Sequence, residues 1–230
     1  MKIDLSRMDK KLYAVLKAAA INCGRLGLEA FIVGGTVRDL LLKRQNYDLD
    51  VVVVGETRSL IEALSGKFKV RPVLHNQFKT AAFSLGDRIR LDIVTARKEV
   101  YEYNGALPLV ELGTLKDDLY RRDFTINAMS VSLRQENFGE LFDYFGGYED
   151  LKRGSIRVLH DKSYFDDPTR ILRAIRFEKR LGFKISANDR LLITAALNSE
   201  AIEAVRPVRY FKEIKKILTE KEALFILRRL

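Results

Sequence analysis

The chain has 230 residues, of which 47% are hydrophobic and 31% charged, and its formal net charge is +10. This length fits one large domain or two small ones, and the apolar runs are too short for a membrane-spanning helix. The single cysteine, Cys23, excludes an internal disulfide and a cysteine-based metal cluster. The basic excess is typical of a protein that meets a polyanion such as nucleic acid, although a generally charged surface would also explain it.

The first part of the chain alternates helical and extended patterns. Apolar residues recurring at helical spacing predict an amphipathic helix over residues 9–23 that ends at Gly24. Further on, the patterns predict strands over 31–33 and 48–54, helices over 36–43 and 59–64, a hairpin of 81–85 with 88–94, a loop over 98–113, a helix leading to Arg121, a strand over 128–133, and a loop-rich stretch from Gly146. This alternation predicts an α/β domain.

The pattern changes near Asp161. From Pro168 to Leu230 the periodicity is helical, with no strand signal, and Pro168 and Pro207 both suit helix starts. We therefore expect two domains, an α/β domain over 1–160 and a helical domain over 161–230. Residues 223–230 are apolar and helical without a stop signal, so we expect the helical domain to be truncated at this end.

Two carboxylates, Asp48 and Asp50, begin the apolar run over 51–54. Residues two apart in a strand share a face, and carboxylates this close repel each other unless a cation lies between them. Mg²⁺ binds such carboxylates together with substrate phosphates. Upstream, Gly34 and Gly35 let the backbone approach a phosphate in front of a helix start. A lone Asp-x-Asp is more often a solvated turn, but this combination predicts phosphoryl or nucleotidyl transfer.

A third carboxylate, Asp92, lies between Leu91 and Ile93 in a predicted strand. A charge between two apolar neighbours is costly unless it faces solvent or a ligand. One interpretation is an outward-pointing residue on an alternating strand. We favour the other, in which Asp92 completes the metal site, because a metal ion would supply the missing partner.

Three motifs, in order, resemble those of the class II tRNA nucleotidyltransferase (CCA-adding enzyme) and bacterial poly(A) polymerase family. They are 33–39 (VGGTVRD) with 47–50 (YDLD), 121–129 (RRDFTINAM) and 166–177 (DDPTRILRAIRF). The resemblance spans residues 31–183. It implies an α/β head of the polymerase-β-like nucleotidyltransferase type, a small mixed sheet with helices, followed by an all-helical neck. The family often has Glu-Asp where this chain has Asp166-Asp167, which leaves the role of Asp166 open.

The resemblance also implies roles for the motif residues. Asp48, Asp50 and Asp92 become catalytic ligands of Mg²⁺. Asp123 and Asn127 face the ribose, and Arg122 suits the triphosphate because a guanidinium forms forked hydrogen bonds. The implied nucleotide-binding set is Gly34, Gly35, Arg38, Arg122, Asp123, Asn127, Asp166, Asp167, Arg170, Arg173 and Arg176.

The third motif bears on base choice. Asp167, Arg170 and Arg173 are three residues apart and would share one side of a helix. A carboxylate acceptor with a guanidinium donor suits the Watson–Crick edges of cytosine and adenine, and the resemblance implies that the protein itself selects C or A. The alternative is an ion-pair ladder on a solvated helix.

The function implied is template-independent addition of C, A or both to the 3′ acceptor end of tRNA. The RNA 3′-hydroxyl attacks the α-phosphate of CTP or ATP and pyrophosphate leaves. Poly(A) polymerase acting on other RNA 3′ ends is the nearest alternative, and a non-catalytic RNA-binding module is an alternative from another class. The polar N-terminus favours a cytoplasmic protein. The oligomeric state and the role of residues 97–121 stay open.

Overall fold

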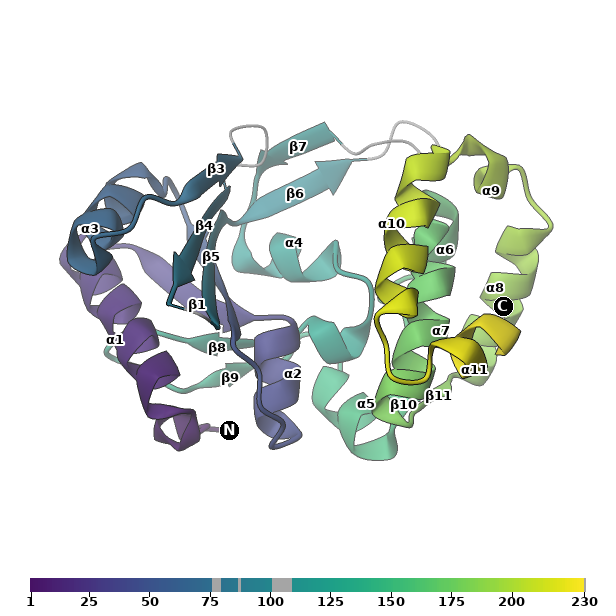
Figure 1. Cartoon of the computed structure of the whole chain (residues 1–230), viewed down its shortest axis with the longest axis horizontal. Helices are drawn as coiled ribbons and strands as arrows, with labels where there is room; N and C mark the ends of the chain where they lie inside the picture. Colours follow the sequence, from purple (N-terminus) through teal and green to yellow (C-terminus); the bar gives the residue numbers. More distant parts are fainter. Residues whose placement is uncertain (76–79, 87, 101–108, 230) are drawn as a thin grey trace. The chain divides into compact units, whose positions relative to one another are not determined.

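A seven-stranded sheet in the order β3-β4-β5-β2-β1-β8-β9 forms the centre of the first part of the chain (Figure 1). The structure is a computed structural model that describes residues 1–75, 80–86, 88–100 and 109–229. The strands of this sheet are β1 (Glu29–Val33), β2 (Asp48–Val54), β3 (Val73–His75), β4 (Thr80–Leu85), β5 (Ile89–Thr95), β8 (Ser130–Ser132) and β9 (Leu141–Phe142). The sheet is mixed, because β2 and β5 run parallel while the other neighbouring strands are antiparallel.

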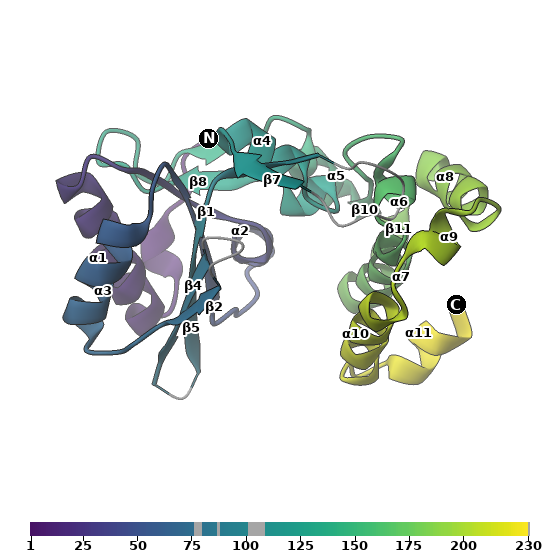
Figure 2. The ribbon, with the colours of Figure 1, turned by 90° about the horizontal axis from the view of Figure 1, so that it is seen from above.

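Helices cover both faces of this sheet. Helices α1 (Lys10–Arg25) and α3 (Arg58–Phe68) lie together on one face, and α2 (Gly35–Leu41) lies on the other (Figure 2). The central strand β2 is therefore buried on both sides, and its β-branched run suits that position: Val51, Val52 and Val53 are at most 1% exposed. A 3-10 helix (Leu5–Arg7) precedes α1, and α4 (Leu115–Tyr120) follows the two-stranded sheet of β6 (Arg97–Val100) with β7 (Leu109–Leu112).

The second part of the chain is mainly helical. It contains α5 (Gly147–Arg153), α6 (Ser163–Asp166), α7 (Thr169–Leu181), α8 (Ala187–Leu197), α9 (Ala201–Ala204), α10 (Pro207–Leu218), α11 (Ala223–Arg229) and the short parallel pair β10 (Ser155–Ile156) with β11 (Lys184–Ile185). Helices α10 and α11 pack on α7. Among the described helices, none is long and apolar enough to cross a membrane.

The contacts divide the chain into two compact units. The first unit comprises residues 1–98, 110–121 and 127–144, and the second comprises 99–109, 122–126 and 145–230. Residues 145–160 thus group with the helices that follow them. The boundary between the predicted domains, 1–160 and 161–230, rests on the change in sequence periodicity and stays a proposal.

Several predicted elements are confirmed and others are wrong. The strand over 48–54 is β2 with the same bounds. Helix α3, however, runs through Gly66, since a helix anchored by the buried Leu60 and Leu64 tolerates one glycine at a penalty of about 1 kcal/mol. Glycines 146 and 147 open helix α5, whose first turn is acidic and last turn basic, as the helix dipole favours.

Two further expectations fail because short strands form where the sequence pattern predicted none. The predicted loop over 98–113 contains most of β6 and all of β7, which pair with each other, and its residues 101–108 lie outside the described part of the chain. The predicted absence of strands after Pro168 is wrong for β11, whose two residues pair with β10.

Asp189 should be essential to the folded second unit. It is completely buried, and its Oδ1 accepts hydrogen bonds from the Val158 backbone N–H and from the Tyr164 hydroxyl, both at 2.9 Å. Replacing Asp189 with Ala leaves these buried donors unsatisfied, so we expect the free energy of unfolding to fall by about 3 kcal/mol, and by about 1 kcal/mol for Tyr164→Phe. Denaturant unfolding measures both. Glu200→Ala, at an exposed site of the same unit, is the control, and an Asp189→Ala variant as stable as this control would contradict the prediction.

Candidate active site

The predicted carboxylates meet on two adjacent strands. In the parallel register of β2 with β5, Asp50 lies opposite Asp92, and Asp48 lies opposite Arg90. Residues opposite each other on neighbouring strands share a face of the sheet, as do residues two apart on one strand. Asp48 is exposed and the other two aspartates are half-buried, whereas Leu49 between them is fully buried on the opposite side. The fold thus gathers three carboxylates on one face of the sheet.

A cation already lies among these carboxylates. The Arg90 Nε donates to both carboxylate oxygens of Asp92, at 2.9 and 3.1 Å. Asp92 raises the pKa of Arg90 through these hydrogen bonds and its charge, and Asp48 and Asp50 add to the effect. This face therefore stabilises positive charge, and its oxygen donors are of the type that hard divalent ions bind.

The ligand set is nonetheless not assembled for a metal ion. In the part of the chain that the structure describes, no group of three or more His, Cys, Asp or Glu side chains is placed to hold one. The three carboxylates fit a divalent ion in their chemistry and strand register. To bind the ion, Asp92 would have to release its hydrogen bonds from Arg90. Metal binding by Asp48, Asp50 and Asp92 stays a prediction.

The turn before α2 is bound directly to the carboxylate strand. Gly34 has φ +68° and ψ −136°, a backbone conformation that glycine adopts without strain. Thr36, which is 2% exposed, donates from Oγ1 to the Asp48 carbonyl at 2.9 Å and accepts from the Asp50 N–H at 3.1 Å. Sequence reasoning missed Thr36, and its only signal was its position directly after Gly34-Gly35.

Arg38 and Asn127, both predicted to bind nucleotide, contact each other. Arg38 is 4% exposed; it forms two 2.9 Å hydrogen bonds to Asp39, and its Nη1 donates to Asn127 Oδ1 at 2.6 Å. The Asn46 side-chain amide also donates to Asp39, at 3.0 Å. Arg38 is thus part of a buried network that fixes the orientation of Asn127.

Asp123 contacts the third motif within the second unit. Its Oδ2 accepts from Arg173 Nε at 2.9 Å and also from Arg173 Nη2, while its Oδ1 accepts from the Phe124 N–H at 2.9 Å. Asp123, and then Glu213, raise the pKa of Arg173 by their charge. The structure therefore brings together two predicted nucleotide-binding residues, whereas Arg122 is half-buried beside Asp123 in the chain.

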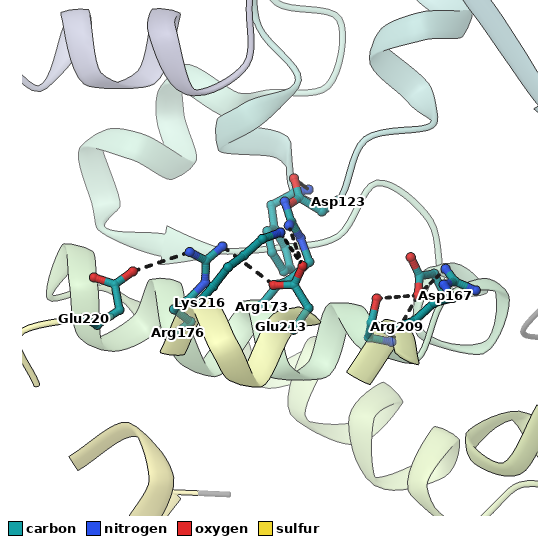
Figure 3. Close-up of polar contacts among 10 residues, drawn as sticks. Asp123, Asp167, Arg173, Arg176, Arg209, Glu213, Lys216 and Glu220 are labelled. Atoms are coloured by element: carbon teal, nitrogen blue, oxygen red, sulfur yellow. Dashed lines mark hydrogen bonds and ion pairs between the residues drawn. The ribbon is translucent and has the colours of Figure 1, made fainter. Parts of the chain in front are cut away.

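The residues of the third motif do not form a ladder with one another. Asp167 precedes α7, and its Oδ1 accepts from Thr169 N at 3.1 Å and Thr169 Oγ1 at 2.6 Å, with the Arg209 Nη2 at 2.9 Å (Figure 3). Arg170 is 5% exposed and its Nη1 donates to the Ser163 carbonyl at 3.4 Å. The prediction that Asp167 lies on the same helical face as Arg170 is wrong, because the helix begins only after Pro168.

The remaining motif residues are also held by specific partners. Arg176 is 7% exposed, 3.4 Å from Glu220 and 3.8 Å from Glu213, and burial lowers its pKa. Burial raises the pKa of Asp166, which lies 4.0 Å from His160. The partners on α10, Arg209 and Glu213, were missed by sequence reasoning because they lie about forty residues from the groups they bind.

Comparisons with known proteins agree with these motifs. A sequence model of the poly A polymerase head domain matches residues 30–157. The chain is 45% identical, over 94% of its length, to a Geobacter sulfurreducens A-adding tRNA nucleotidyltransferase, of which it covers 25%. It resembles the solved structure of a CCA-adding enzyme in apo form (TM-score 0.91, 43% identity, 98% of this chain and 53% of the other). A Thermotoga maritima CCA-adding enzyme complexed with tRNA is also similar (TM-score 0.85, 41% identity, 98% and 51%).

These similarities confirm the predicted resemblance and fold class. The chain spans about a quarter of the Geobacter protein and about half of the two solved chains. The family generally depends on divalent metal ions. Because the matched region covers more than half of the chain, including its first two motifs, the chain belongs to the poly A polymerase head domain family.

Proposed function

We propose that the chain is the head and neck of a template-independent nucleotidyltransferase that adds C, A or both to the 3′ acceptor end of tRNA. In this reaction the RNA 3′-hydroxyl attacks the α-phosphate of CTP or ATP and pyrophosphate leaves. The observation that carries the proposal is the β2–β5 register, which places Asp50 opposite Asp92 with Asp48 on the same face. The relatives named as tRNA nucleotidyltransferases support tRNA as the substrate. We propose that the activity takes place in the cytoplasm.

Asp48, Asp50 and Asp92 are the proposed ligands of Mg²⁺. When bound, Mg²⁺ would supply electrostatic stabilisation for the attacking and leaving oxygens. The chain prepares the site: Thr36 fixes the backbone of both β2 aspartates, and Arg90 orients the Asp92 carboxylate by its hydrogen bonds. The Gly34-Gly35 turn admits the phosphates, and Arg122 adds donors for the triphosphate.

The nucleotide is selected by side chains that the fold already orients. Asn127, held by Arg38, and Asp123, held by Arg173, are the proposed ribose contacts. Asp167 and Arg170 are the proposed base contacts, and the other third-motif residues, Asp166, Arg173 and Arg176, support them. A misfit base leaves these polar groups unpaired, which is an effective basis for rejection.

A direct test uses tRNAs that end before, within and just short of CCA. Each is incubated with the chain, Mg²⁺ and labelled CTP or ATP. Extension that stops at CCA, at CC or after one A identifies the three tRNA activities, whereas long A tracts on any RNA would support the poly(A) polymerase alternative. RNA binding with no nucleotide binding in equilibrium dialysis would support the non-catalytic alternative.

Asp50→Asn should abolish transfer and leave the fold intact. The substitution removes a negative charge beside two others, so we expect the free energy of unfolding without metal to stay within about 1 kcal/mol of wild type. We expect the rate of nucleotidyl transfer to fall by at least about a hundredfold, because one of the three proposed Mg²⁺ ligands is lost.

Single-turnover extension and denaturant unfolding provide the two readouts for this prediction. Glu56→Gln, an exposed acid in the same unit, is the matched control. Turnover near wild type in Asp50→Asn would eliminate the proposed metal site.

Binding of an RNA acceptor stem should weaken steeply with salt. The formal net charge of +10 favours phosphate contacts, and each such contact releases counterions. We expect affinity to fall at least about tenfold between about 50 and 200 mM salt, measured by fluorescence anisotropy. A flat response would show that the excess positive charge lies off the RNA path.

A further inference from the structure

One face of α10 carries charged side chains that contact the third motif. Arg209 and Glu213 lie one turn apart on α10. Figure 3 shows both side chains directed at α7 and the turn that precedes it. Glu213, 7% exposed, lies 3.4 Å from Arg173 Nη1, and Arg209 lies 2.9 Å from Asp167.

The closest contacts of Asp167 are made by one of its two carboxylate oxygens. Oδ1 accepts hydrogen bonds from Thr169 N and Thr169 Oγ1, and it lies 2.9 Å from Arg209 Nη2 in an ion pair. A carboxylate held at one oxygen by two donors and a cation presents the other oxygen in a defined direction as an acceptor.

The groups that hold Asp167 Oδ1 come from two different elements. Thr169 is the first residue of α7 and lies two positions after Asp167, so its two hydrogen bonds fix Oδ1 only relative to the turn before α7. Arg209 comes from α10 and approaches from a second element, and its side chain is 20% exposed against 19% for Asp167. A half-buried, charge-assisted contact of this kind restrains the rotation of the carboxylate that the turn alone would allow.

We propose that Arg209 is a positioning residue for base choice. By binding Oδ1 of Asp167, it leaves Oδ2 as the acceptor for the exocyclic amino group that cytosine and adenine share and that uracil lacks. The inference rests on the proposed function, in which Asp167 contacts the base.

The test compares Arg209→Met and Arg209→Lys with Asp167→Asn. Arg206→Met is the matched control, since Arg206 is an exposed arginine next to the start of the same helix. The readout is the ratio of kcat/KM for CTP or ATP to that for UTP, with the corresponding ratio of dissociation constants measured on the free nucleotides. The Mg²⁺ concentration for half-maximal rate and the thermal midpoint are recorded for each variant.

We expect Arg209→Met to lower the discrimination ratio about tenfold at an unchanged Mg²⁺ requirement. Arg209→Lys, which keeps the charge but loses the planar fork of donors, should restore part of the ratio and serves as the folded variant if Arg209→Met is unstable. Arg206→Met should match wild type.

Three outcomes would overturn the inference. A wild-type ratio in both Arg209 variants, beside a collapsed ratio in Asp167→Asn, would reduce Arg209 to a structural contact and leave the proposed function intact. Faster transfer of all nucleotides at an unchanged ratio would identify Arg209 as a competitor of the nucleotide. A wild-type ratio in Asp167→Asn would remove Asp167 from base choice and count against the proposed function as well.

Discussion

The parallel pairing of β2 with β5 is the constraint on which the candidate site depends. Asp50 and Asp92 are separated by forty-two positions in sequence, and only this register places them opposite each other. A slip of one residue would put Asp50 opposite a buried aliphatic side chain and turn the carboxylates toward the core. The register is protected because Leu49 and Leu91, which alternate with the carboxylates, are both fully buried on the other face. Burial of leucines on one face of the sheet thus fixes the register that brings mutually repelling carboxylates together on the other face.

In the second unit, two arginines of α7 are held by carboxylates. Arg173 is partly exposed and Arg176 is buried, and both lie among the carboxylates of Asp123, Glu213 and Glu220. Buried and partly buried ion pairs of this kind add little net stability, because desolvation of the charges offsets their attraction. Their effect is to fix geometry: the guanidinium groups are already oriented, so less conformational entropy is lost when a polar ligand binds. Burial lowers the pKa of Arg176 while Asp123 raises that of Arg173, so neighbouring arginines on one helix experience opposite environments.

Sequence reasoning succeeded where the signal is local. The bounds of β2 and the shared face of Asp48 and Asp50 follow from strand alternation within one segment. It failed where the partner lies far along the chain. Nothing near Asp167 points to Arg209, and nothing near Arg173 points to Glu213. The helix predicted over 59–64 was also too short, since α3 continues through Gly66, where the buried leucines outweigh the weak helix propensity of glycine.

The buried Arg38 shows how one motif residue can position another. Its guanidinium donates to the Asp39 carboxylate and to the side-chain oxygen of Asn127. The contact with Asn127 has a chemical consequence. Because arginine only donates, it fixes which end of the Asn127 amide is the oxygen, and the NH₂ group must point away from Arg38. The Asn127 amide is thereby set to present its NH₂ group as a donor on the side away from Arg38. In this way the buried Arg38 sets the orientation of the amide of Asn127, which is itself only 6% exposed.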